Sequence, residues 1–269
     1  MPGRFIALEG PDGVGKTTLA KRLGTVDYAG AVAMLPSRST AGSDEPAPLV
    51  FVSRRQISAT SAYSADLMRQ LADVLWHSGE ATDLPDAFWV AVQAAWATAH
   101  GTTVLGPLLE AGYDVITDGW VYKFFSKLLV QGYTLDQLEV IFGRVRMPDA
   151  VILLAADPGA LYDRRQAEFR PSELGMHAGY QALGRDTFVT YQRQGLVRLQ
   201  NLANALGWHT VNLDPAVSVD DTRDLLTPVV NAARTVARAT ATAPSSEPTA
   251  PSAGPDGVTL PLAGEPCST

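Results

Sequence analysis

One stretch near the N-terminus constrains the chain more than any other. It matches the pattern G-x-x-x-x-G-K-[ST] and reads Gly10-Pro11-Asp12-Gly13-Val14-Gly15-Lys16-Thr17. The apolar run Phe5–Leu8 precedes it, and the helical pattern Lys16–Leu23 follows it. Glycines let backbone N–H groups turn toward phosphate oxygens, and the start of a helix adds positive potential there. The stretch therefore predicts a strand, a phosphate-binding loop and a helix, in that order.

The residue types in this loop indicate separate roles. Lys16 is expected to bridge the β- and γ-phosphates of a nucleoside triphosphate, and the Thr17 hydroxyl to bind Mg²⁺. ATP and Mg²⁺ are therefore the expected cofactors. A glycine-rich turn without a ligand is the alternative, and the flanking strand and helix count against it. The residues predicted to contact the nucleotide are Gly10, Asp12, Gly13, Val14, Gly15, Lys16, Thr17 and Thr18.

A carboxylate at the end of a second apolar run completes this expectation. Asp114–Thr117 has the length and composition of a buried strand, and Asp118 follows it directly. An acid in this position can hold Mg²⁺ through water beside a phosphate loop. A strand-terminal aspartate also commonly caps a helix, so Asp118 alone indicates little. Together with the loop it predicts a metal site of Thr17 and Asp118, with Lys16 and Asp118 as catalytic residues.

Charge and cysteine content exclude several classes of protein. The chain has 269 residues, a net charge of −7 and one cysteine, Cys267. An acidic chain does not suit nonspecific nucleic-acid binding, and a single cysteine excludes a disulfide scaffold. No apolar run approaches the roughly 20 residues that span a bilayer, and the start of the chain lacks the apolar segment of a signal peptide. We expect a cytoplasmic chain without nucleic-acid or membrane partners.

Short apolar runs alternate with longer helical patterns along the chain, which predicts an α/β fold with a mainly parallel sheet flanked by helices. The predicted strands are Arg4–Glu9, Ala31–Leu35, Leu49–Ser53, Asp114–Thr117, Ala150–Ala155 and His209–Leu213. The predicted helices are Lys16–Leu23, Ser64–Trp76, Asp86–Ala111, Trp120–Gly132, Leu135–Val145, Pro158–Ala167, Thr187–Leu206 and Asp220–Arg238. Residues 239–269 are rich in Ala, Pro, Ser and Thr and predict a disordered tail after a domain of residues 1–238.

With these pieces in place, the chain resembles the thymidylate kinase family of P-loop nucleoside monophosphate kinases. The resemblance rests on the order and spacing of four stretches: FIALEGPDGVGKTTLAKRL, LLEAGYDVITDGWVY, PDAVILL followed by DP, and FVTYQRQG. It implies a three-layer P-loop NTPase fold with a lid at about residues 164–184. It also implies phosphoryl transfer from ATP to a nucleoside monophosphate, dTMP or a related pyrimidine nucleotide, and it allows a homodimer.

The resemblance also implies roles for residues that contact the acceptor nucleotide. Asp12 stands where the family carries an acid that meets the acceptor sugar, and Arg193 stands at an arginine of the helix after the lid. The family binds the acceptor phosphate with an arginine after its second strand. Arg38 lies at about the right distance from Lys16, and Arg54 and Arg55, after a further predicted strand, are the alternative.

Arginines of the lid are the expected transition-state groups. Family members with a plain phosphate loop keep these arginines in the lid, and the segment here contains Arg164, Arg165 and Arg170. A planar guanidinium suits the charge that develops on a transferred phosphoryl group. Arg165 and Arg170 are preferred to Arg164 as the catalytic residues.

The chain departs from the family pattern at the acceptor site. The family's Asp-Arg pair is Asp118-Gly119 here, and Lys123, one helical turn on, is expected to bind substrate in its place without a bidentate fork. Restoring arginine at Gly119 is then expected to improve dTMP turnover about tenfold. Alignment places Ala97 at the base-reading arginine and Gln93 at an aromatic position. A kinase for a modified nucleotide or nucleoside and a non-catalytic ATP-binding regulator therefore remain as alternatives.

Overall fold

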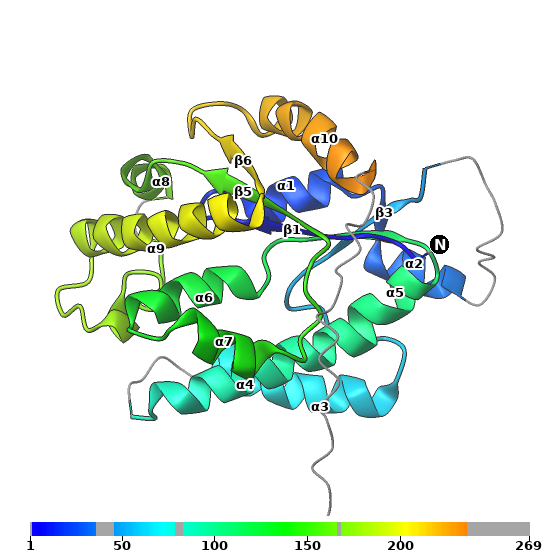
Figure 1. Ribbon diagram of the computed structural model, residues 1–269, viewed down its shortest axis with the longest axis horizontal. Coiled ribbons are helices and arrows are strands. Elements are labelled where there is room, and N and C mark those ends of the chain that lie inside the picture. Colours follow the sequence, from blue (N-terminus) through cyan, green and yellow to red (C-terminus); the bar gives the residue numbers. More distant parts are fainter. Residues whose placement is uncertain (1, 36–45, 79–82, 166–167, 236–269) are drawn as a thin grey trace, which may run out of the picture. The chain divides into compact units, whose positions relative to one another are not determined.

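A computed structural model of the chain describes residues 2–35, 46–78, 83–165 and 168–235 (Figure 1). The chain divides into two units, residues 1–236 and 237–269, and every described residue belongs to the first. Arg38, the tail predicted over residues 239–269 and part of the predicted lid lie outside the described residues.

The strands of the described residues form a single parallel sheet, which confirms the α/β fold expected from the sequence. The strand order is β2-β3-β4-β1-β5-β6, so the chain crosses over between non-adjacent strands as P-loop folds require. The strands are β1 (Phe5–Glu9), β2 (Val26–Asp27), β3 (Leu49–Val52), β4 (Asp114–Thr117), β5 (Ala150–Ala155) and β6 (His209–Asn212).

Helices cover the sheet on both faces (Figure 1). They are α1 (Lys16–Leu23), α2 (Tyr28–Met34), α3 (Ala62–Ala72), α4 (Asp86–His100), α5 (Gly106–Glu110), α6 (Val121–Val130), α7 (Leu135–Phe142), α8 (Pro158–Arg165), α9 (Arg185–Leu206) and α10 (Val219–Thr235). Two π-helical segments, η2 (Asp73–His77) and η3 (Gly101–Leu105), extend α3 and α4, and η4 (Met176–Ala178) is a turn of 3₁₀ helix.

The alternating side chains of β1 explain why the sheet lies between two layers of helices. Phe5 and Ala7 pack with residues of α3 to α7, whereas Ile6 and Leu8 pack with residues of α1, α8 and α10. All four side chains are fully buried. Successive residues of a strand point to opposite faces, so an unbroken apolar strand needs a cover on both sides. Fully burying a large apolar side chain contributes about 1.5–3 kcal/mol, which accounts for the central position of this strand.

The strand predicted over Ala31–Leu35 is wrong. Residues Tyr28–Met34 form α2 instead, and the strand at this edge is the short β2 before it. The Asp27 side chain caps the helix by accepting the Gly30 N–H at 2.7 Å. An apolar run of this length fits a strand or a helix equally well, and the alanines at Ala31 and Ala33 favour the helix.

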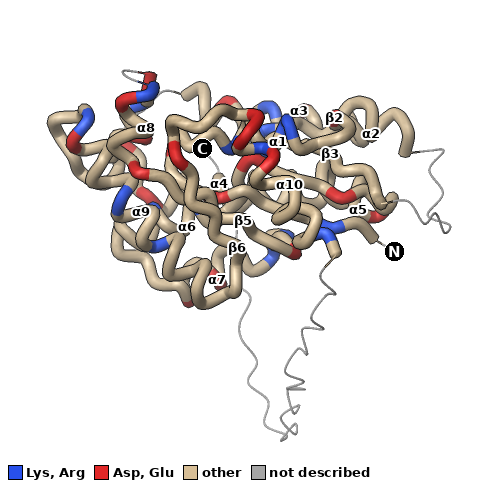
Figure 2. The backbone as a smooth tube through the Cα atoms, turned by 90° about the horizontal axis from the view of Figure 1, so that it is seen from above, with Lys and Arg blue, Asp and Glu red and all other residues tan. Residues whose placement is uncertain are grey.

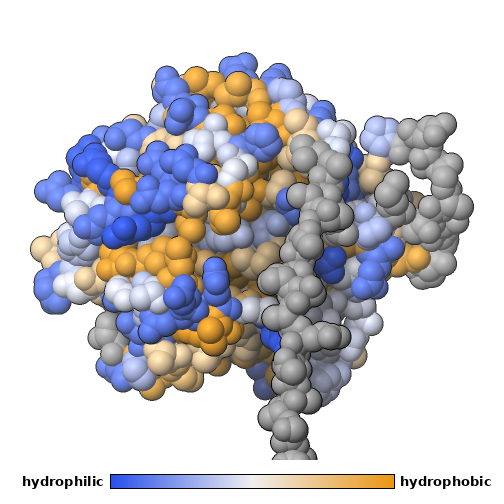
Figure 3. Space-filling model, viewed as in Figure 1, coloured by the Kyte–Doolittle hydropathy of each residue, from blue (hydrophilic) through white to orange (hydrophobic). Residues whose placement is uncertain are grey.

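The surface is mixed in character. Figure 2 shows basic and acidic residues distributed over most elements of the described chain. Apolar patches are interrupted by polar ones in Figure 3, and α7 contributes the exposed side chains of Leu135, Val140 and Ile141. None of the helices among the described residues is long and apolar enough to cross a membrane.

Candidate active site

Strand order alone brings three chain segments together. β1, β4 and β3 are neighbours, and the register aligns Val52 of β3 with Thr117 of β4. Because parallel strands end at the same edge of a sheet, the residues that follow them meet there. The loop that begins at Gly10, the carboxylate of Asp118 and the side chain of Arg54 therefore lie at one edge of the sheet.

The phosphate loop needs glycine at its ends. Gly10 has φ +148°, and a Cβ on it would lie 2.3 Å from the Leu154 carbonyl oxygen of β5. Gly15 has φ +101° and immediately precedes α1. Both conformations are costly for any residue with a side chain. The expected strand, loop and helix are therefore present in the expected order.

Lys16 lies inside the arc of this loop. Its Nζ donates hydrogen bonds to the carbonyl oxygens of Gly10 at 2.8 Å and Pro11 at 2.7 Å. Desolvation lowers the pKa of the Lys16 ammonium, and the negative charge of Asp12 partly opposes this. The ammonium is therefore held at the loop by neutral carbonyl groups that an anionic phosphate can replace.

Thr17 and Asp118, the two predicted metal ligands, are hydrogen-bonded to each other. Thr17 Oγ1 donates to Asp118 Oδ2 at 2.7 Å, and the buried carboxylate also accepts the Arg54 N–H through Oδ1 at 2.8 Å. A hydroxyl beside a carboxylate offers the hard oxygen donors that Mg²⁺ prefers, with phosphate and water as further ligands. In the described part of the chain, no three His, Cys, Asp or Glu side chains form a closed metal cage. These residues fit a magnesium ion shared with a nucleotide.

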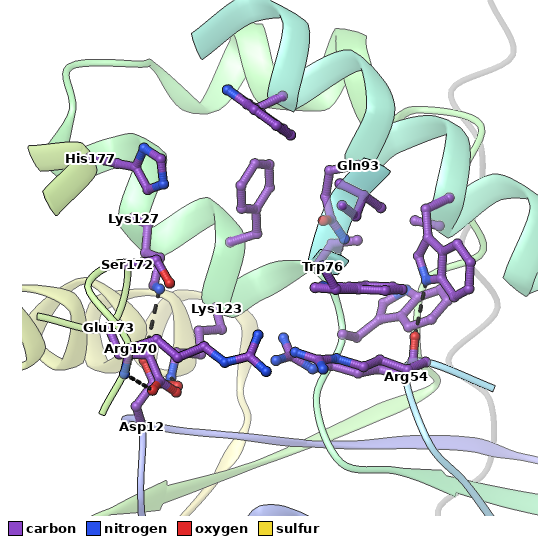
Figure 4. A pocket seen from close by; sticks show the side chains of 18 of the residues that line it. Asp12, Arg54, Trp76, Gln93, Lys123, Lys127, Arg170, Ser172, Glu173 and His177 are labelled. Atoms are coloured by element: carbon purple, nitrogen blue, oxygen red, sulfur yellow. Dashed lines mark hydrogen bonds and ion pairs between the residues drawn. The ribbon is translucent and has the colours of Figure 1, made fainter. Parts of the chain in front are cut away.

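Two cavities meet beside this edge of the sheet. The first, about 650 Å³, is lined by the phosphate loop, Asp118 and the start of α10, and we call it the loop cavity. The second, about 590 Å³, is lined by α4, α6 and the four tryptophans Trp76, Trp89, Trp96 and Trp120, and we call it the tryptophan cavity (Figure 4). The residues that line both cavities are Asp12, Arg54, Lys123, Arg165 and Glu173.

Arg54 is the arginine that the structure brings to this junction. Its carbonyl oxygen accepts a 3.0 Å hydrogen bond from Trp96 Nε1, which fixes the backbone after β3. The next residue, Arg55, stacks its guanidinium 4.9 Å above the Trp76 ring in the tryptophan cavity. The sequence left open whether Arg38 or these arginines follow the relevant strand. Arg38 lies outside the described residues, and Arg54 lines both cavities.

The backbone conformation at Gly119 does not suit an arginine. Its φ is +137°, a conformation that strains any residue with a side chain. A Cβ there would contact the Arg54 Cδ at 3.7 Å and lie 4.0 Å from the Lys16 Cε. The strain at this φ counts against the expected gain from Gly119→Arg, and a side chain there would extend beside Arg54 and Lys16.

Asp12 and Lys123 form a buried pair at the junction. The Asp12 Oδ1 is ion-paired with Lys123 Nζ, and its Oδ2 lies 3.8 Å from Lys127 Nζ. These lysines hold the pKa of the Asp12 carboxyl well below its usual value against the opposing effect of burial. Figure 4 shows Asp12, Lys123 and Lys127 on one side of the tryptophan cavity, and Arg54, Trp76 and Gln93 on the other.

The three predicted lid arginines take different positions. Arg164 reaches the phosphate loop, where its Nη2 donates to the Gly13 carbonyl oxygen. Arg165 stacks 5.0 Å above the Phe169 ring and lines both cavities, whereas Arg170 lines the tryptophan cavity alone. The preference for Arg165 agrees with its place at the junction, but Arg164 is the arginine in contact with the loop.

The Arg193 side chain lies away from the other residues predicted to bind the acceptor. Its side chain is 61% exposed, 3.9 Å from an oxygen of Asp157, and lines a separate surface hollow. The residue that enters the site is its neighbour Gln192, which is buried and hydrogen-bonded to Asp12. One position along a helix rotates a side chain by about 100°. An alignment error of a single residue therefore moves a group out of the site.

Sequence reasoning also missed Glu9, a fully buried acid at the end of β1. Its Oε1 accepts the Trp120 N–H at 2.9 Å, and burial raises the pKa of its carboxyl. Gln93 and Ala97, the residues that the alignment places at base recognition, both line the tryptophan cavity. The signal that could have identified Glu9 is a charged residue ending an otherwise apolar strand.

Comparisons with known proteins add sequence evidence to this geometry. No model of a protein family matches the chain. A thymidylate kinase of Xanthomonas oryzae pv. oryzae is 31% identical over 157 residues, which cover 58% of this chain and 57% of the relative. The thymidylate kinases of Synechococcus sp. and Rhizorhabdus wittichii are 29% and 28% identical, covering 68% and 65% of this chain and 84% and 73% of those proteins.

The match therefore spans a little over half the length of the Xanthomonas relative. The matched proteins are all thymidylate kinases. The chain has the parallel sheet and phosphate loop that the resemblance implied. Sequence similarity and architecture agree, and both make the chain similar to thymidylate kinases.

Proposed function

We propose that the chain transfers the γ-phosphoryl group of ATP to a nucleoside monophosphate, dTMP or a related pyrimidine nucleotide, with dTDP as the product from dTMP. The observation that carries the proposal is the junction of the loop cavity and the tryptophan cavity. Two substrates that exchange a phosphoryl group must bind side by side, with the reacting atoms at the contact between their sites. Arg54, Lys123 and Arg165 are the cations that line both cavities.

The loop cavity is the proposed ATP site. Lys16 would exchange its two carbonyl partners for phosphate oxygens, and the backbone N–H groups of the loop would donate to the same phosphates. Thr17 and Asp118 would hold Mg²⁺, which supplies charge neutralisation on the phosphate oxygens. The protein's own contribution is to fix the triphosphate so that its terminal group faces the junction.

The tryptophan cavity is the proposed acceptor site. Arg54 would bind the acceptor phosphate, and Arg165 would stabilise the charge that develops on the transferred group. The Gln93 amide offers one donor and one acceptor to the edge of a base, within a cavity walled by Trp76 and Phe124. Aromatic walls accept any base face, so selectivity rests on few polar groups.

Two absences from the family pattern favour a second acceptor. Ala97 lines the tryptophan cavity at the position aligned with the base-reading arginine, and Gly119 replaces the arginine beside Asp118. Removing a polar base contact lowers discrimination between related bases. A kinase acting on a modified nucleotide or nucleoside is therefore the second proposal. A non-catalytic ATP-binding regulator is the third, and the two missing arginines are the feature in its favour.

ADP release from MgATP separates these proposals. The panel contains dTMP, dUMP, the purine and cytosine monophosphates, thymidine and 5-substituted pyrimidine nucleotides, with Lys16→Ala as the inactive control. We expect release to depend on a pyrimidine monophosphate, with dTMP and dUMP used about equally well. Release driven only by a substituted nucleotide or a nucleoside supports the second proposal. Calorimetric ATP binding without release on any acceptor supports the regulator and contradicts kinase activity.

The proposal includes a cytoplasmic location and association of two copies. The exposed apolar side chains of Leu135, Val140 and Ile141 on α7 support the second part, because apolar surface favours contact with another protein. Sedimentation of the purified chain tests it. A monomeric mass at micromolar concentration contradicts the dimer without affecting the proposed reaction.

A further inference from the structure

Asp12 is fully engaged by partners from within the chain. Its Oδ1 is ion-paired with Lys123, and its Oδ2 accepts a 3.0 Å hydrogen bond from Gln192 Nε2 and lies 3.8 Å from Lys127 Nζ. Its backbone N–H donates to Gln192 Oε1 at 2.9 Å. The side chain is only 12% exposed. Resemblance to the kinase family implied that this acid meets the acceptor sugar, but here the carboxylate is already occupied.

Lys123 is in the opposite situation. Its side chain is 9% exposed and lines both cavities, and Asp12 is the acid paired with it among the described residues. An ammonium has three N–H donors, and its Nζ has no hydrogen-bond partner in the described chain beyond this ion pair. Donor capacity therefore remains for an anion at the junction of the cavities.

At Gly119 the chain lacks the side chain that the family carries next to Asp118. Glycine at this position supplies no cation of its own, and Lys123 lies one helical turn further along the chain. We infer that Asp12 and Lys123 act as one unit, in which Asp12 positions the Lys123 ammonium for the phosphoryl group between the two cavities and does not itself bind the acceptor. This inference rests on the proposed kinase function. Lys123 contacts the substrate, and Asp12 is a positioning residue.

The electrostatic environment agrees with this division of roles. Burial lowers the pKa of the Lys123 ammonium, and the charges of Lys16 and Lys127 lower it further. Asp12 opposes all three effects. A buried lysine needs such a partner to stay protonated at neutral pH. Gln192 secures the partner in turn, since its Nε2 also donates to the Glu173 carbonyl oxygen at 2.9 Å.

A double-mutant cycle on the full chain tests the inference. The kcat and the acceptor KM are measured with MgATP and dTMP for wild type, Asp12→Asn, Lys123→Met and the double variant. We expect Lys123→Met to lower kcat about 10- to 100-fold, as for loss of one charged contact. Asp12→Asn should lower kcat in the wild-type background and by less than about twofold in the Lys123→Met background. If Asp12→Asn lowers kcat by the same factor in both backgrounds, the two residues act independently and the inference is overturned.

The 3′-deoxy analogue of dTMP supplies a readout that a structural role would not change. If Asp12 only positions Lys123, the ratio of kcat/KM for dTMP and its analogue is the same in wild type and Asp12→Asn. A carboxylate that binds the sugar hydroxyl predicts instead that this ratio falls toward one in the variant, which would overturn the inference. Lys127→Met is the matched control, because Lys127 faces the same carboxylate and lines the tryptophan cavity but not the loop cavity. Its kcat should fall less than that of Lys123→Met.

Melting temperatures and calorimetry keep the test decisive. If Asp12→Asn leaves Lys123 unpaired and does not fold, the double variant is compared with Lys123→Met. Equal kcat values then support the view that Asp12 and Lys123 act as one unit. If wild type turns over no acceptor, the proposed function fails, and the same cycle is read from the dissociation constants of dTMP. Additive losses of affinity, or no dTMP binding at all, then overturn the inference.

Discussion

The backbone N–H of Arg54 donates a 2.8 Å hydrogen bond to Oδ1 of Asp118, the carboxylate whose other oxygen accepts from Thr17. One side chain at the end of β4 therefore fixes both the segment after β3 and the first residues of α1. Under the proposed function, this carboxylate would hold Mg²⁺ and also position an arginine, so it would link the ATP site and the acceptor site. Loss of this carboxylate should affect both sites.

Asp118→Asn is expected to lower the rate at saturating ATP about 10- to 100-fold, because an amide is a weaker partner for Mg²⁺ and for the Thr17 hydroxyl. Activity should vanish in EDTA and return with Mg²⁺ or Mn²⁺. Steady-state kinetics with a metal titration measure both effects. Asp136→Asn, an exposed acid at the start of α7, is the control. An Asp118→Asn rate within about threefold of wild type would leave this acid only a structural role through its contacts with Thr17 and Arg54.

Lys16→Ala is expected to abolish phosphoryl transfer with little change in fold. The ammonium is hydrogen-bonded to two neutral carbonyl oxygens of the loop. Neutralisation of the β- and γ-phosphates is the function lost. ADP release and circular dichroism test this, with Lys21→Ala on the exposed face of α1 as the control. Normal turnover by Lys16→Ala would contradict the assignment of the phosphate loop.

Gly119→Arg should reduce dTMP turnover and lower the melting temperature. A residue with a side chain is strained at φ +137°, at a cost of about 1 kcal/mol or more, and the new side chain meets Arg54. Gly119→Ala separates the two causes, since it carries the strain without the guanidinium. Differential scanning calorimetry and kinetics are compared for both variants. An increase in kcat/KM for dTMP in Gly119→Arg is the contrary result.

Arg234→Gln is expected to destabilise the fold by about 3 kcal/mol. Its Nε donates to Asp114 Oδ2 at 2.7 Å, and the two side chains are only 14% and 8% exposed. Asp114 also accepts the Arg4 N–H, so the pair joins α10 to the edges of β1 and β4. Urea unfolding measures the change. Arg223→Gln on the same helix, whose acid partners are exposed, should cost less than about 1 kcal/mol.

Acid should weaken the fold through His100. Burial lowers the pKa of this imidazole to about 4, while the unfolded residue titrates near 6.5. The unfolded chain therefore takes up the proton first as pH falls, and stability is lost between pH 6.5 and about 4. The loss attributable to His100 is about 3 kcal/mol. Urea titrations at several pH values of wild type and His100→Gln test this, and equal pH slopes for the two proteins would exclude His100.

Elements with strong local signals were predictable from the sequence. The phosphate loop has its own residue pattern, and α1 begins and ends where the pattern placed it. Each central strand is an apolar run between turn residues, which identifies strands buried on both faces. At the edge of the sheet this signal fails, because β2 has two residues and the alanine-rich run after it forms α2.

The acceptor site was less predictable because its residues come from separate segments. The sequence does not show that Arg54 follows the strand beside β4, because strand order is a property of the whole sheet. Arg193 and Gln192 are adjacent in sequence, but only Gln192 faces Asp12. Such choices depend on helix rotation, which a motif of a few letters does not fix to one residue.

Gln192 joins three segments through a single amide: α9, the phosphate loop at Asp12 and the segment that contains Glu173. If that segment moves as the lid that the family resemblance implies, it must break the bond to the Glu173 carbonyl and loosen the same side chain that accepts the Asp12 N–H. Hydrogen–deuterium exchange at the Asp12 amide would then report lid opening, although that amide belongs to the loop. Nucleotide binding that orders the phosphate loop should in turn slow hydrogen–deuterium exchange in the segment that contains Glu173. Opening of either segment would then loosen the other through Gln192.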